Sequence, residues 1–136
     1  MGRIEIDINR INKVVEIIIN KAKDEIPLMP FETAKIEHFN IEEVLYFNEK
    51  PFVLSLSCSP PLFEDTYKAM LICCEVTVPA LDIDVEIPVL NEKTEDILKT
   101  IESEPIKNKL VNTFIDLIKD VDFNYGHLIF QASCLP

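Results

Sequence analysis

Residues 67–89 read YKAMLICCEVTVPALDIDVEIPV and decide the fold. The run from Tyr67 to Val78 has apolar residues at both odd and even positions, which is typical of a strand in the middle of a sheet. Pro79 ends that run, since proline has no backbone N–H to donate. Apolar and acidic residues then alternate through 81–89, which predicts a half-exposed strand. The tight connection at Pro79-Ala80 makes the two strands antiparallel neighbours.

Earlier in the chain, short apolar runs between turn residues predict further strands. Residues 33–39 could form the first, and 42–47 fit either a strand or a short helix. The sequence at 48–51, Asn-Glu-Lys-Pro, predicts a turn. Residues 52–58 alternate as a strand, and a short strand is expected at 3–7. One face of 52–58 holds Phe52, Leu54, Leu56 and Cys58, and the other holds Ser55 and Ser57.

A helix is predicted over residues 7–26, where apolar residues recur at three- and four-residue steps. Asp7 or Asn9 can cap its first turn, and Pro27 ends it. Its apolar surface is wider than one stripe. We therefore expect this helix either to be well buried or to contact a second surface such as another subunit. The residues that widen the stripe are Val14, Ile17 and Ile19.

Two helices are predicted in the C-terminal part. Thr94 is the N-cap candidate of the first, and Ser103 opens the second, with Glu104 and Pro105 in its first turn. A turn is expected at 124–126, followed by a last short strand or docked tail at 128–132. The apolar face of the second helix comprises Leu110, Val111, Phe114, Ile115, Leu117 and Ile118.

The order of these elements predicts one α+β domain over residues 1–136. It combines an N-terminal helix, an antiparallel meander sheet of three to five strands, and two C-terminal helices packed on one face. The segment at the amino end lacks the long apolar run of a signal peptide, so a cytoplasmic location is expected. No membrane partner is expected, because the apolar run at 17–19 is too short to span a bilayer.

The net charge of −11 bears on the partner. A polyphosphate is repelled by such a surface, so nonspecific nucleic-acid binding is not expected. The charge favours a basic partner, or else it serves solubility. An acidic mimic of DNA is a further alternative, which would need the charges in a stripe.

The residues that usually carry catalysis or hold cofactors are sparse. The chain has only Gly2 and Gly126, which excludes a glycine-rich phosphate loop. His38 and His127 are its only histidines, and a pair of His127 with Cys134 is less expected than a surface histidine. The cysteines lack zinc-ligand spacing and are expected to be buried free thiols. No enzyme activity and no cofactor are therefore predicted. The four cysteines are Cys58, Cys73, Cys74 and Cys134.

An acidic triplet is the main candidate for binding. On a strand, Asp82, Asp84 and Glu86 face one side. They form a polar strand face, a surface for a basic partner or, with further ligands, a divalent metal site. Two aromatic residues beside turns, Phe47 and Phe63, are candidates to line a surface groove. Residues expected to extend the acidic surface are Glu64, Asp65 and Glu75.

Parts of this pattern resemble the SecB-type export chaperones. Proline opens an alternating strand in Pro51–Leu56, a long strand similar to that family's follows at Asp65–Val78, and an alternating strand at 81–90 precedes a helical part. The resemblance spans about residues 34–122. It implies an acidic oligomer that binds unfolded chains along apolar grooves without ATP. The helix at 7–26 and the segment 122–131 depart from that family.

These observations leave three functional hypotheses. The first is a non-enzymatic protein-binding module, in its most concrete form a SecB-like chaperone for unfolded polypeptides. The second is a small acidic inhibitor or immunity-type protein that masks a basic site on its partner. The third is a metal-dependent enzyme that uses the acidic triplet.

Overall fold

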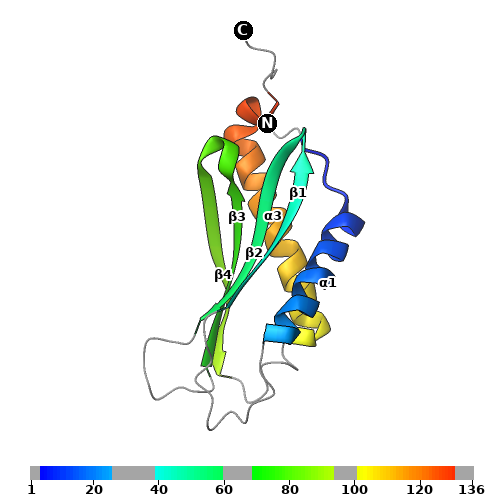
Figure 1. Ribbon diagram of the computed structural model, residues 1–136, viewed down its shortest axis with the longest axis vertical. Coiled ribbons are helices and arrows are strands. Elements are labelled where there is room, and N and C mark those ends of the chain that lie inside the picture. Colours follow the sequence, from blue (N-terminus) through cyan, green and yellow to red (C-terminus); the bar gives the residue numbers. More distant parts are fainter. Residues whose placement is uncertain (1–3, 26–38, 60–68, 94–100, 131–136) are drawn as a thin grey trace.

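The computed structural model describes residues 4–25, 39–59, 69–93 and 101–130, and two helices lie on one face of a four-stranded sheet (Figure 1). This α+β arrangement confirms the predicted N-terminal helix and antiparallel sheet. The elements are α1 (Ile8–Glu25), β1 (Phe39–Phe47), β2 (Lys50–Ser59), β3 (Ala69–Val78), a 3-10 turn η1 (Pro79–Leu81), β4 (Ile83–Lys93) and α3 (Glu104–Ile129).

The sheet is an antiparallel meander in the order β1-β2-β3-β4. Its central strands are β2 and β3, which confirms the central position predicted for the run that ends at Val78. The ambiguous segment 42–47 is strand. Asn48 and Glu49 connect β1 to β2 with positive φ angles of 49° and 65°, which is the backbone of a type I′ hairpin turn. The register between β3 and β4 shifts between Ile72 and Cys73, so that Val89 is not paired with a residue of β3.

Helix α1 begins as its sequence predicts. The backbone N–H of Asn9 donates to Oδ1 of Asp7 at 3.0 Å, so Asp7 is the cap. Of the three residues that widen the apolar stripe, Val14 and Ile19 are buried and Ile17 is 45% exposed. The expected short strand at 3–7 is wrong for residues 4–7, which are irregular and lead into the capped helix.

Helix α3 begins after Ser103, with Pro105 near its start, as expected. It continues to Ile129, so the turn expected at 124–126 is wrong, and Leu128 and Ile129 are helical rather than part of the short strand or docked tail expected at 128–132. The apolar face continues through Val121, Gly126 and Ile129, all buried, because the sheet supplies a surface for that last turn to pack on. The first of the two predicted C-terminal helices falls largely on 94–100, outside the described residues.

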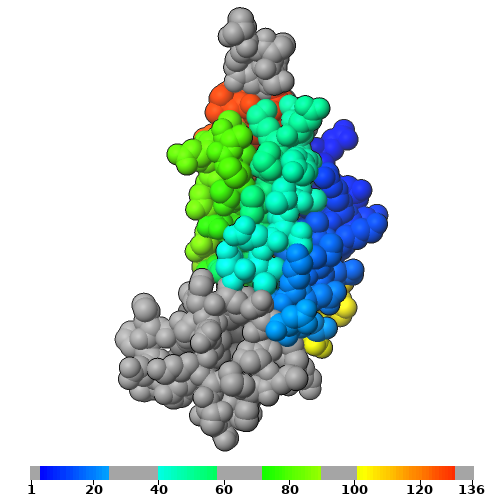
Figure 2. Space-filling view, viewed as in Figure 1, coloured from blue at the N-terminus to red at the C-terminus, as the bar shows by residue number. Residues whose placement is uncertain are grey.

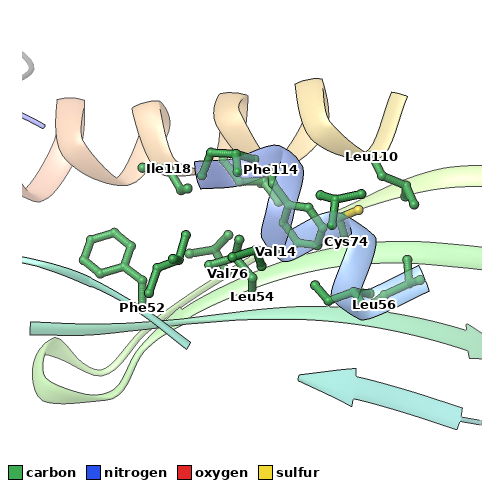
Figure 3. Close-up of a cluster of buried hydrophobic side chains, with 14 of the residues drawn as sticks. Val14, Phe52, Leu54, Leu56, Cys74, Val76, Leu110, Phe114 and Ile118 are labelled. Carbon is green, nitrogen blue, oxygen red and sulfur yellow. The ribbon is translucent and has the colours of Figure 1, made fainter. Parts of the chain in front are cut away.

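The core lies between the sheet and the two helices. Figure 3 shows side chains of β2 and β3 that point toward α3 and α1. The fully buried positions alternate along β2 and β3, and each second residue between them faces away from the helices. Core residues drawn there include Val14, Phe52, Leu54, Leu56, Cys74, Val76, Leu110, Phe114 and Ile118.

Candidate functional site

The face of the sheet opposite α1 and α3 is the candidate site, and we call it the open face. In Figure 2 the strands themselves form this surface, with α1 along one edge. Neither described helix packs on it. Its described residues are Asn40, Glu42, Val44 and Tyr46 of β1, Pro51, Val53, Ser55 and Ser57 of β2, Cys73, Glu75 and Thr77 of β3, and Asp84, Glu86 and Pro88 of β4.

Four carboxylates gather on the open face, and we call them the carboxylate cluster: Glu42, Glu75, Asp84 and Glu86. The strand registers place Glu42 opposite Ser55, Ser55 opposite Glu75, and Glu75 opposite Glu86. One row across the sheet therefore holds three glutamates and a serine. No lysine or arginine is present among the open-face side chains described above. Like charges in directly opposed positions repel, so a cation brought to this face would relieve the repulsion.

Asp84 lies beside the row and is opposite Thr77, whose hydroxyl contacts Oδ1 of Asp84 at 3.5 Å. Partial burial raises the pKa of Glu75 from 4.5 to about 7, with help from a hydrogen bond to Asp84 and the charges of Asp84, Glu86 and Glu42. Near neutral pH, Glu75 therefore carries a proton for part of the time and donates it to Asp84.

This shift predicts a pH-dependent stability. Because the folded-state pKa of Glu75 lies above its usual value, folding favours the protonated form, and the stabilisation is lost as pH rises from about 4.5 through 7. After allowance for solvent screening, we expect about 1 kcal/mol of the unfolding free energy to be lost between pH 5 and pH 8. The Glu75→Gln variant should lack this part of the pH dependence.

The measurement is urea unfolding followed by circular dichroism at both pH values. Glu49→Gln, which changes an exposed glutamate in the β1–β2 turn, is the control and should keep the wild-type difference. An identical pH difference in wild type and Glu75→Gln would contradict the prediction.

The predicted binding residues are only partly brought together. Asp84 and Glu86 lie on the open face, whereas Asp82 sits in the turn before β4 with a φ of 53°. The triplet on one strand face is therefore reduced to a pair, because η1 occupies the connection. Phe47 lies in the core, 7% exposed, and so lines no exposed groove. Phe63 lies outside the described residues.

The burial of Phe47 has a clear local cause. Its ring packs edge to face against that of Phe52, with centroids 4.9 Å apart. The guanidinium carbon of Arg10 lies over the Phe47 ring, 5.5 Å from its centroid. Nη2 of Arg10 also donates to the carbonyl of Tyr46 at 3.2 Å. Helix α1 thus covers the aromatic residue that the sequence places beside a turn.

Glu42 was not among the site residues predicted from the sequence. Glu75 was expected to extend the acidic surface and does so, beside Asp84. The signal for Glu42 was present in the turn at 48–49, since a two-residue hairpin sets the partner of every β1 residue. That signal was usable only once 42–47 was known to be strand.

Part of the open face is apolar. Val44 and Tyr46 on the edge strand β1 are 45% and 58% exposed. Both lie on the same side of β1 as Glu42. The face thus combines a charged row with an apolar margin, a mixture found in protein interfaces.

The thiols and histidines provide no recognisable catalytic pair in the described part of the chain. Cys73 and Cys74 are free and buried, as predicted. Burial and then the Glu86 charge raise the pKa of Cys73, and burial raises that of Cys74, so both favour the thiol form. His127 is exposed in the last turn of α3. His38, Cys58 and Cys134 lie outside the residues whose side chains are described.

Within the described ranges, no group of three or more His, Cys, Asp or Glu side chains is arranged to hold a metal ion. The described helices also include none that is long and apolar enough to cross a membrane. Comparisons with protein-family models, with curated proteins and with solved structures found no match.

Proposed function

We propose that this chain is a non-enzymatic protein-binding module whose open face binds a basic surface of a partner protein. The carboxylate cluster, free of cationic neighbours among the described side chains of that face, carries the proposal. A small acidic inhibitor or immunity-type protein that masks a basic site is the form that fits best.

The charge arrangement supports this function in two ways. The net charge of −11 attracts a basic protein over a distance and speeds its approach. The cluster then offers a local minimum of potential, at which a cation relieves repulsion that the sheet imposes on neighbouring strands. The apolar margin at Val44 and Tyr46 supplies area that excludes water around the charged contacts.

The test compares two variants with equal loss of charge. The first variant carries Glu42→Gln, Asp84→Asn and Glu86→Gln. It should bind hexa-arginine and hexa-lysine about tenfold more weakly than the wild type. The control removes exposed carboxylates away from the open face, with Glu5→Gln, Asp24→Asn and Asp116→Asn. Calorimetry at low ionic strength gives both affinities.

The control should bind as the wild type does, and binding should weaken as salt is added. Equal weakening in both triple variants would mean that only net charge matters, and the open face would not be the site. No binding of either peptide to the wild type would count against the function itself.

A SecB-like chaperone is the second candidate. An exposed apolar margin on the edge strand of a four-stranded meander, with helices packed on the other face, favours it. A reduced and alkylated, permanently unfolded protein of acidic net charge separates the two candidates. The chaperone should bind that client despite the charge, and should be a stable oligomer by light scattering, whereas the inhibitor should do neither.

A further inference from the structure

Ser55 is the least exposed polar side chain on the open face. It is 2% exposed, although it points away from the core between Leu54 and Leu56, which are both fully buried on the helix side. No hydrogen bond of its hydroxyl is found among the described residues, and its oxygen is not one of the fully buried polar atoms there that lack a partner. A hydroxyl with so little access to water gains from a hydrogen-bond partner.

The residues around Ser55 explain its burial and indicate which group could form a hydrogen bond with its hydroxyl. Glu42 lies opposite it on β1 and Glu75 opposite it on β3. With adjacent strands about 4.8 Å apart, these two glutamates stand about 10 Å from each other across the serine. Serine is shorter than glutamate, so the hydroxyl lies below the level of the two carboxyl groups.

The charged groups around this point are all acidic in the described strands. Glu42 belongs to β1, Glu75 to β3, and Asp84 and Glu86 to β4. Ser57 and Val53, the next open-face residues of β2, are uncharged. A group that fits here must donate hydrogen bonds in several directions and carry positive charge.

We propose that Ser55 with its flanking Glu42 and Glu75 forms a seat for one cationic side chain, an arginine or a lysine, of the partner protein. The seat rests on the proposed function and deepens it, since it names the group recognised. The cation donates to the serine hydroxyl from above and to the two glutamates at its sides. A guanidinium has five donors in a plane and can reach all three, while an ammonium has three.

The seat has a consequence that simple surface attraction lacks. A cation placed beside Glu75 favours the carboxylate, so binding lowers its pKa and releases a proton. With a pKa of about 7 in the free protein, close to half a proton should be released on binding at pH 7. Glu75→Gln should abolish that release.

The experiment uses the full chain with hexa-arginine, hexa-lysine and, as a negative control, hexa-glutamate. Calorimetry at pH 7 is repeated in phosphate and in Tris, whose ionisation enthalpies differ, so that the difference in heat counts released protons. The test variant is Ser55→Val, which removes the hydroxyl and fills the space above it with methyl groups while suiting a strand. Ser57→Val is the matched control, the same change two residues along the same face of β2.

Ser55→Val should weaken binding of the favoured peptide by about tenfold and reduce proton release, and Ser57→Val should change neither. Tighter binding of hexa-arginine would assign the seat to a guanidinium, and tighter binding of hexa-lysine would assign it to an ammonium. Ser55→Ala, which only deletes the hydroxyl, repeats the test in case Ser55→Val fails to fold.

Two outcomes would overturn the seat, and they differ in what they say of the proposed function. Unchanged affinity and unchanged proton release in both Ser55 variants would remove the seat, while the proposed function would survive if the triple carboxylate variant still lost binding. If the wild type bound neither cationic peptide, both proposals would fall.

Discussion

Replacing Phe114 by alanine is expected to lower the free energy of unfolding by about 4 kcal/mol, the largest effect we predict for a single side chain. Phe114 lies on α3 and is fully buried. Figure 3 shows its ring between α3 and the strands. Removing the ring forfeits its burial and leaves a cavity, which the rigid sheet on the other side is poorly placed to fill.

Phe123 provides the matched control, because it is the same residue type on the same helix but 69% exposed. Phe123→Ala should change the unfolding free energy by less than about 0.5 kcal/mol. Chemical denaturation followed by circular dichroism measures both, since the chain has no tryptophan. Equal effects of the two variants would contradict the position of α3 on the sheet.

Replacing Asn48 by alanine is expected to cost about 2 kcal/mol, although the residue is exposed. Two terms contribute. Asn48 has a φ of 49°, a conformation that asparagine tolerates better than alanine. Its side-chain Nδ2 also donates to the carbonyl of Ile129 at 2.8 Å, which ties the β1–β2 turn to the end of α3.

Asn48→Gly separates the two terms, because glycine adopts the same backbone without strain but lacks the amide. It should cost about 1 kcal/mol, half the effect of alanine. Amide hydrogen exchange in the last turn of α3 should speed up in both variants. Losing the Asn48 amide costs only this much stability because Nζ of Lys50 donates to the same carbonyl at 2.8 Å. Its positive charge also suits the negative end of the helix. Equal costs for glycine and alanine would show that backbone strain does not contribute.

The Asn48 contact also explains why the end of α3 was mispredicted. The Asn124-Tyr125-Gly126 sequence is a turn signal when read locally, since glycine and asparagine are weak helix formers. In the folded chain, Gly126 is buried on the helix face, and the hairpin turn supplies donors for the carbonyl of Ile129. Because the residues that stabilise this helix end lie about 80 positions earlier in the chain, the sequence around Ile129 does not indicate where the helix ends.

The strands were far more accessible to sequence reasoning. The alternation in β2 between buried leucines and outward serines has a period of two, which only a strand produces. Pro79 and the turn at 48–49 mark the connections, and short connections between such strands leave an antiparallel meander as the simplest arrangement. The predicted faces of Phe52, Leu54 and Leu56 are therefore confirmed.

The candidate site was predicted in part for the same reason. Asp84 and Glu86 share a face because they are two residues apart on one strand, and this follows from local geometry. That Glu75 and Glu42 join them, and that Asp82 does not, depends on the register between strands and on the backbone of the turn before β4. Strand register and turn conformation depend on how two segments pair, so neither can be predicted from one segment alone.

By itself, the sequence determined the N-terminal helix with Asp7 or Asn9 as its cap, the strand faces, and the acidic character of the chain, because periodicity, capping and charge are local properties. The tertiary structure alone decided that α3 continues to Ile129, that Phe47 is buried beneath Arg10, and that Ser55 lies between two glutamates. Each of these depends on contacts between residues distant in the chain, where packing and register outweigh local preference.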